Sequence, residues 1–330
     1  MKFAIIDQQE AKDFNRNIEG PWSVFFSVFK NMKYEIVNHK ANPDVVIFMN
    51  DHKTLRRSIK RKLPNVKLIL VIWESPVTKP SDFKDKNLDD YDLIFSPSNL
   101  WLSRPNVIYF NWPQSTKVNW TGSFEDWARR KNKVALFASN KFSFVHGEMY
   151  SVRRKIIEQL DNNIDVYGLN WSNRILSIIN LVKASIRVLL SSQMHSLSLR
   201  QHAFVRPKSY FGPRATKIEL MHYKFCLVVE NEINYVSEKL FDAISFGCIP
   251  LYIGPELSEF GLPSDIVLRI DHVEEIENVM KQALQFEKVS FNRVLKARDF
   301  LNSERAQEYD NVKVLKEIAL RICEKAMEWK

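Results

Sequence analysis

Short apolar, β-branched runs recur along the chain and alternate with polar or helix-patterned stretches. A first series of expected buried strands comprises Phe3–Asp7, Asp44–Met49, Lys67–Trp73, Asp92–Phe95 and Val107–Phe110. A second series comprises Val134–Ala138, Ile164–Tyr167, Phe225–Val229, Ile249–Ile253 and Ile266–Ile270. Because strands that alternate with helices form parallel sheets covered on both faces, the pattern predicts an α/β fold with two doubly wound, Rossmann-like domains facing a cleft.

The polar, basic stretch Gly122–Lys133 separates the two series. It predicts an N-terminal domain over residues 1–130 and a C-terminal domain over residues 131–330, the latter ending in a helical tail. Ligands of such sheets bind at the carboxyl ends of the strands.

Composition narrows the class of protein. The chain has 330 residues and a net charge of +9, which is compatible with anionic small ligands, membrane surfaces or nucleic acid. Only 8 glycines occur, where average usage gives roughly 23, and neither glycine-rich nucleotide-binding signature is present. Three unpaired cysteines, no apolar run of about 18 residues and no signal-peptide pattern predict a cytoplasmic protein.

Two segments are unusually basic. Residues 53–61 place Lys53, Arg56, Arg57, Lys60 and Arg61 at helical spacing, which indicates a solvated face or a surface for an anionic partner. Residues 166–218 contain no Asp or Glu. Two interpretations of this second segment stay open: an excursion packed on its own domain, or contact of residues 174–208 with an anionic membrane, which would make the protein peripheral on the inner face.

Nucleic acid is not an expected partner, because the basic residues are interleaved with Ile and Leu rather than with aromatic side chains.

Residues 223–254 form the most informative block, YKFCLVVENEINYVSEKLFDAISFGCIPLYIG. The pattern predicts a strand, a polar loop, a helix, a glycine stop at Gly247 and a second strand. The loop Glu230–Asn234 therefore lies at the carboxyl end of a strand and at the amino end of a helix, where anions bind. Lys239 adds a full positive charge beside it.

This block resembles the donor-site motif of the family 10 glycosyltransferases, the α-1,3/4-fucosyltransferases, with the pattern Y-K-F…E-N…D/G-Y-[VI]-T-E-K. The segment Phe137–Asn140, then Arg153 and Asp165–Gly168, is similar to that family's S-N…R…D-[VF]-[YF]-G stretch, and Trp73–Pro76 is similar to its E-S-P segment. The loop between Asn231 and Tyr235 is shorter than in the family, and Ser237 replaces the usual Thr.

The resemblance implies a GT-B type inverting transferase that moves L-fucose from GDP-β-L-fucose to a hydroxyl of a glycan acceptor. The N-terminal domain would meet the acceptor and the C-terminal domain would hold the nucleotide sugar. By motif, Glu74 would be the catalytic base, and the donor-binding residues would be Arg153, Asn231, Tyr235, Glu238 and Lys239. Arg153 and Lys239 would bind the diphosphate, Glu238 a hydroxyl of the ribose or sugar, and Asn231 and Tyr235 would line the pocket.

The resemblance implies no obligatory cofactor, with a divalent metal at most stimulatory. Asp90–Asp92 spell D-x-D, a metal–diphosphate signature elsewhere, but Asp92 begins a strand instead of following one. Two alternatives remain. EKLFDAISFGCIPLYI is also similar to the exostosin-type transferases, which use other donors, and a non-catalytic protein could use the scaffold to bind membranes or polyanions.

Overall fold

The computed structural model describes residues 1–7, 13, 20–172, 178–183, 185, 205–214 and 216–329. The chain divides into two compact units. The first contains Met1–Pro113 together with Glu308–Lys330, and the second contains Gln114–Gln307. Each is built on one parallel sheet.

The first unit carries a parallel sheet in the order β2-β1-β3-β4-β5-β6. Its strands are β1 (Lys2–Ile6), β2 (Glu35–Ile36), β3 (Val45–Met49), β4 (Lys67–Val71), β5 (Leu93–Ser96) and β6 (Val107–Tyr109). Its helices are α1 (Pro21–Asn31), α2 (Lys53–Lys62), α3 (Asp85–Leu88) and α10 (Asn311–Glu328).

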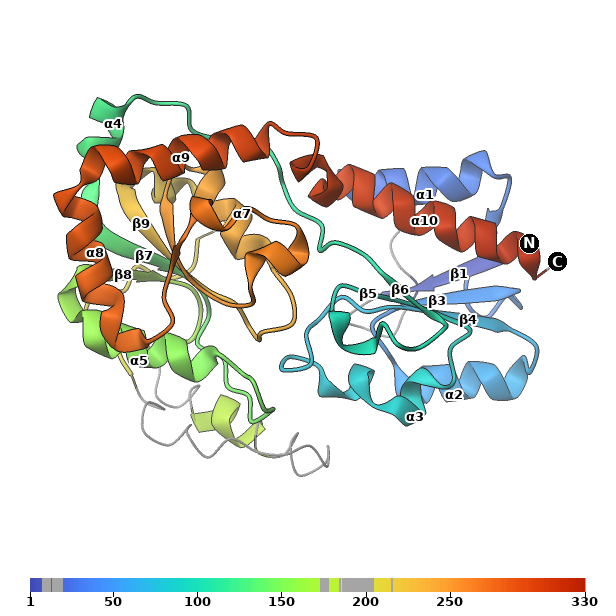
Figure 1. Ribbon diagram of the computed structural model, residues 1–330. Helices are drawn as coiled ribbons and strands as arrows, with labels where there is room; N and C mark the ends of the chain where they lie inside the picture. The colour runs from blue at the N-terminus through green and yellow to red at the C-terminus, as the bar shows by residue number, and fades with distance from the viewer. Residues whose placement is uncertain are drawn as a thin grey trace. The chain divides into compact units, whose positions relative to one another are not determined.

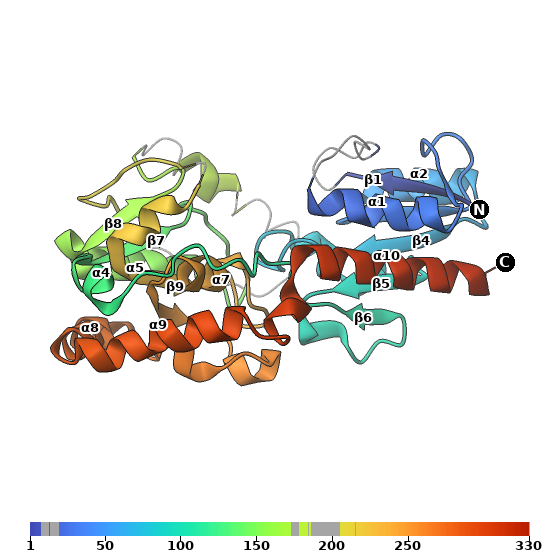
Figure 2. The ribbon, with the colours of Figure 1, turned by 90° about the horizontal axis from the view of Figure 1, so that it is seen from above.

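Both faces of this sheet are covered. Helices α1 and α10 lie on one face and α2 and α3 on the other (Figure 1), and α1 and α10 run side by side (Figure 2). Alternate residues of each strand enter the two cores: in β1, Phe3 and Ile5 pack toward α1 and α10, whereas Ala4 and Ile6 pack toward α2. This alternation explains the near-continuous apolar runs of the sequence.

The second unit carries a parallel sheet in the order β11-β10-β9-β7-β8. Its strands are β7 (Lys131–Phe137), β8 (Ile164–Tyr167), β9 (Tyr223–Val229), β10 (Ile249–Ile253) and β11 (Leu268–Arg269). Its helices include α4 (Phe124–Ala128), α5 (Tyr150–Leu160), α7 (Glu238–Ser245), α8 (Ile276–Gln285) and α9 (Glu287–Leu301).

The expected fold class of two Rossmann-like, doubly wound domains is thus observed as two parallel sheets with surrounding helices. The units differ from the expected 1–130 and 131–330 in two places. The first ends at Pro113, and α10 returns to it, because Leu315 and Ile318 of that helix pack in the same core as Phe25 and Phe29. The tail expected on the C-terminal domain belongs to the N-terminal one.

The basic segment 53–61 forms most of α2, but its basic residues do not share one solvated face. Arg56 is buried, with Nε 3.0 Å from Asp51 Oδ1 and a second ion pair to Asp90. The other basic residues of this segment are at least partly exposed. A long guanidinium can therefore pair inside a core where the sequence pattern alone indicates surface.

The membrane contact expected for residues 174–208 falls largely outside the described residues. Of the part that is described, Val205 is buried in the core of the second unit and Leu181 packs against Phe142, whereas Ile178, Ile179 and Val182 are exposed. Across the described ranges, no helix combines the length and apolar character that a membrane span requires.

Candidate functional site

The second unit has a cavity of about 350 Å³ at the carboxyl ends of β7, β8 and β9. Strands β8 and β9 lie on opposite sides of β7, so the order of the chain reverses there. Open α/β sheets bind ligands at such a point. The lining residues are Phe137, Ala138, Ser139, Lys141, Arg153, Tyr167, Gly168, Leu169, Pro213, Arg214, Lys217, Asn231, Glu238 and Lys239.

Arg153 projects from α5 and is only 3% exposed. Its Nη2 donates to Val229 O at 2.6 Å, Glu230 O at 3.0 Å and Asn231 Oδ1 at 2.8 Å, and its Nε donates to Val229 O at 3.2 Å. Within the described part of the chain, Nη1 makes no hydrogen bond. Burial lowers the pKa of Arg153, as expected for a cation that is held by neutral oxygens rather than by a paired carboxylate.

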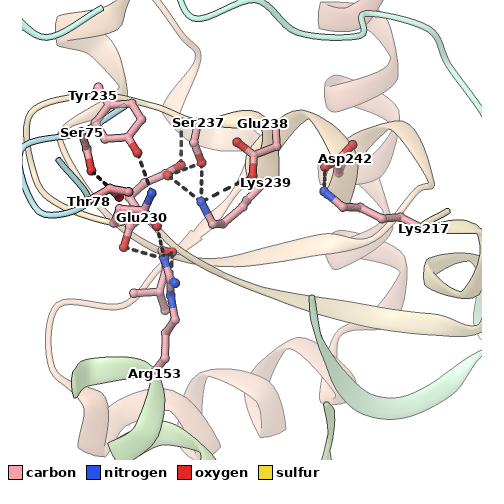
Figure 3. Close-up of polar contacts among 12 residues, drawn as sticks. Ser75, Thr78, Arg153, Lys217, Glu230, Tyr235, Ser237, Glu238, Lys239 and Asp242 are labelled. Carbon is pink, nitrogen blue, oxygen red and sulfur yellow. Dashed lines mark hydrogen bonds and ion pairs between the residues drawn. The ribbon is translucent and has the colours of Figure 1, made fainter. Parts of the chain in front are cut away.

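Lys239 lies in the first turn of α7 and is held in place by Ser237 and Glu230 (Figure 3). Its Nζ donates to Ser237 Oγ at 2.7 Å and is 3.7 Å from Glu230 Oε2. Glu230 is fully buried and accepts hydrogen bonds from both the backbone and the hydroxyl of Ser237. Ser237 Oγ donates to Glu230, and Ser237 makes no side-chain capping hydrogen bond to α7.

Glu238 begins α7 with a side chain that is 49% exposed. Burial alone would raise the pKa of Glu238, but Lys239 and Lys217 outweigh it and lower the pKa to about 2. Lys217 is ion-paired with Asp242 one turn further along α7 (Figure 3). Glu238 is therefore an ionised acceptor at the rim of a cationic pocket, suited to binding hydroxyl groups.

Asn231 and Tyr235 belong to the loop between β9 and α7. Asn231 lines the cavity, and its Nδ2 donates to Tyr235 Oη at 2.7 Å while its Oδ1 accepts from Arg153. Tyr235 is buried behind Asn231 instead of being among the lining residues. Tyr235 therefore orients the side-chain amide of Asn231.

Glu74 belongs to the first unit, just after the carboxyl end of β4. The segment that carries it is fixed on both sides. Trp73 N donates to Asn50 Oδ1 at 2.6 Å, and the backbone N–H groups of Thr78 and Lys79 donate to Ser75 O. Of the predicted site residues, Arg153, Asn231, Glu238 and Lys239 therefore line one cavity, Tyr235 supports it, and Glu74 comes from the other unit.

Sequence reasoning missed three cationic lining residues, Lys141, Arg214 and Lys217. The last two close the acid-free stretch 166–218, so its lack of carboxylates was the available signal. The sequence places Glu230 only at the start of the loop before α7, whereas in the structure Glu230 and Ser237 together position Lys239.

The D-x-D segment lies at the amino end of β5, as its sequence position indicates. Asp90 is ion-paired with Arg56, and Asp92 Oδ1 is 2.8 Å from Lys67 Nζ. Among the described residues, no group of three or more His, Cys, Asp or Glu side chains is arranged to hold a metal.

The sequence matches known proteins over a short segment. No protein-family model matches the chain. A segment of 73 residues is 40% identical to a fucosyltransferase-like protein of Arabidopsis thaliana, and it spans 21% of this chain and 14% of that relative.

Solved structures are similar over most of the chain. An α1,3-fucosyltransferase with GDP-fucose matches with a TM-score of 0.53 and 12% identity, over 89% of this chain and 80% of that one. The Anabaena protein HepE with UDP-glucose matches with a TM-score of 0.58 and 10% identity, over 98% of this chain and 100% of that one. These similarities confirm the GT-B type fold with two Rossmann-like domains.

Proposed function

We propose that this protein is a glycosyltransferase whose second unit binds a nucleoside diphosphate sugar, with GDP-fucose as donor and a glycan hydroxyl as acceptor. The observation that carries the proposal is the pair Arg153 and Lys239, two cations from different helices that line one cavity at the carboxyl end of β9. The 73-residue match to a fucosyltransferase-like protein supports the choice of donor.

The charge of the cavity fits a diphosphate. Five of its described lining side chains are basic, whereas Glu238 is the one acid among them. Arg153 keeps Nη1 for a ligand, and Lys239 keeps the N–H groups that Ser237 does not use. The amino end of α7 adds a partial positive charge. Together these groups would stabilise the charge of a leaving diphosphate, which is what an obligatory metal would otherwise supply.

The proposed reaction is a single in-line displacement. The acceptor oxygen forms a bond to the anomeric carbon as the bond from that carbon to the diphosphate oxygen breaks, so the configuration inverts. Glu74 takes the proton of the acceptor hydroxyl. The electron pair of the broken bond stays on the diphosphate, where Arg153 and Lys239 neutralise it. Glu238 binds a hydroxyl of the ribose or the sugar.

A different nucleotide sugar is the alternative donor. The observation that favours a different donor is the similarity in fold to HepE, whose structure was solved with UDP-glucose. Phosphate-binding groups do not distinguish the two bases, so the cationic pair is compatible with either donor.

Thermal stabilisation by nucleotides tests the proposal. GDP, UDP, CMP and dTDP are added to the purified protein without metal, because a ligand that binds only the folded state raises its melting temperature. We expect a shift with GDP that is lost in Lys239→Ala and kept in Lys296→Ala, a control at an exposed lysine paired with Asp265 in the same unit.

Each other outcome has a definite meaning. A shift with UDP alone would keep the transferase and replace the donor. No shift with any nucleotide would contradict the proposal and favour a non-catalytic binding protein. A shift that appears only when Mg²⁺ is added would contradict a donor site that works without metal.

A further inference from the structure

The end of the acid-free stretch is an integral part of the second unit. Its backbone runs beside β8: Val166 N donates to Ser209 O at 2.9 Å, Phe211 N donates to Val166 O at 2.9 Å, and Gly168 N donates to Gly212 O at 3.1 Å. These residues extend the edge of the sheet next to the cavity. The proposed function gives them no role.

Arg214 follows this edge and is anchored in one orientation. Its Nη1 donates to Phe211 O at 2.6 Å and Pro213 O at 3.2 Å, and its Nε is 2.9 Å from Glu219 Oε1. The guanidinium carbon lies 5.5 Å from the centre of the Tyr167 ring. Among the described residues nothing accepts a hydrogen bond from Nη2, so this lining side chain presents a pre-oriented donor to a ligand.

The cavity has two chemically different ends. Arg153 is bonded to the carboxyl end of β9, whereas Tyr167 ends β8, two strands away, which is about 10 Å at the usual strand spacing. At the β8 end the ring of Tyr167 is stacked on Phe137 with centroids 4.4 Å apart and on Phe211 with centroids 5.2 Å apart. Phe137 and Tyr167 give this end of the cavity an aromatic lining. A nucleoside diphosphate has the same division, with charged phosphates at one end and a flat aromatic base at the other.

From this arrangement, and resting on the proposed function, we infer that Arg214 binds the base of the nucleotide and selects a base edge made of hydrogen-bond acceptors. Guanine presents such an edge in O6 and N7. Adenine presents an amino group in place of O6, which would meet another donor.

Binding measurements with GDP, ADP and inorganic pyrophosphate separate the base from the phosphates. Wild-type protein is expected to bind GDP more tightly than ADP. Arg214→Ala is expected to weaken GDP roughly tenfold, the usual loss when one hydrogen bond to a charged group is removed. The same variant should bring the GDP and ADP affinities together and leave the affinity for pyrophosphate unchanged.

Two further variants control for structure. Lys208→Ala removes another cation of the same stretch, 61% exposed and paired with Asp161 instead of lining the cavity, and should bind all three ligands as wild type does. Arg214→Lys keeps the charge but not the planar fork, and should lose the preference for GDP. The melting temperature without ligand shows whether each variant is folded.

An unchanged preference for GDP over ADP in a folded Arg214→Ala would overturn the inference. Equal losses of GDP and pyrophosphate would also overturn it, because Arg214 would then be a phosphate ligand. If wild-type protein binds none of the three ligands, the proposed function itself is wrong and the inference falls with it.

Discussion

Glu74 is the residue on which the proposed proton transfer depends. Glu74→Gln keeps the size of the side chain and removes its basicity, so GDP should bind as before while release of GDP from GDP-fucose in the presence of a glycan acceptor slows by roughly 10²- to 10⁴-fold. Glu35→Gln is the control, because Glu35 is an exposed glutamate of the same unit. Turnover near the wild-type rate in Glu74→Gln would remove Glu74 from the reaction.

Glu232 makes the stability of the second unit depend on pH. It is 3% exposed, Asn234 Nδ2 donates to its Oε2, and its Oε1 has no partner among the described residues. Burial raises the pKa of Glu232 from 4.5 to about 7. Between these two values the folded state holds a proton that the unfolded state has lost, so the free energy of unfolding falls as pH rises through this window.

Replacing Glu232 with Gln keeps an acceptor for Asn234 and removes the titration. Urea unfolding between pH 4.5 and 8 should therefore show a flatter pH dependence, with the variant more stable at pH 8 by up to about 3 kcal/mol. Exposed Glu275 serves as the control, and Glu275→Gln should follow the wild-type curve. A Glu232→Gln curve parallel to wild type would show that Glu232 stays ionised throughout.

The positions of the site residues could be predicted from the sequence where a motif contains them. They could not be predicted where burial in the folded unit determines what a side chain contacts. Lys239 and Glu238 could be placed from the helix start alone, because the strand–loop–helix pattern fixes which side chains begin α7. Arg153 and Arg154 are consecutive and both buried, each against different partners. Helical periodicity places neighbouring residues about 100° apart and does not indicate that two arginines in sequence will both leave solvent.

At the scale of the element, Gly247 fixes where α7 ends. Its φ is +72°, and a Cβ atom there would lie 2.3 Å from the ring of Trp120. Gly147 has a similar φ of +82°, but a Cβ atom there would meet no described atom within 4 Å. Gly147→Ala should lower the free energy of unfolding by about 1 kcal/mol, the cost of the left-handed backbone. Gly247→Ala should cost more than twice as much, because Trp120 must also move.

Urea unfolding curves of the two glycine variants check this difference. Equal losses in the free energy of unfolding would mean that the ring of Trp120 moves aside without measurable cost. Only the backbone conformation at Gly247 would then matter. The glycine stop itself was predictable from the sequence, because a glycine between a helix pattern and a strand pattern is the residue that most readily takes the left-handed conformation of a helix end. The contact with Trp120 was not, because Trp120 lies more than a hundred residues earlier in the chain.

At the scale of the whole molecule, the alternation of strands and helices predicts two sheets, but it does not predict which of the two units the last helix packs in. The apolar face of α10 shows only that the helix packs against something. Its partner is set by the core it enters, where Leu315 and Ile318 join Phe29 of α1. A linear boundary cannot represent a chain that leaves the first unit at Pro113 and returns to it at Glu308.

Because α10 packs in the core of the first unit, a destabilising substitution in α10 should unfold the first unit and leave the second unit folded. Ile318→Lys places a charge in the core of the first unit, where an unpaired charge is strongly destabilising. Cys323, buried on the same helix, should then react with a thiol reagent, although burial in the intact protein raises its pKa to about 12. Cys226 and Cys248 are buried in the second unit and should stay protected.

The described lining residues of the cavity at the carboxyl ends of β7, β8 and β9 all belong to the second unit, so the proposed stabilisation by GDP should survive in Ile318→Lys while the proposed sugar transfer is lost. Glu317→Lys changes the neighbouring residue, which is 55% exposed, and should leave all three thiols protected. Mass spectrometry of the labelled peptides identifies which cysteines react. If Cys226 and Cys248 become reactive together with Cys323, the two units unfold as one, and the stability of the second unit depends on α10 as much as that of the first.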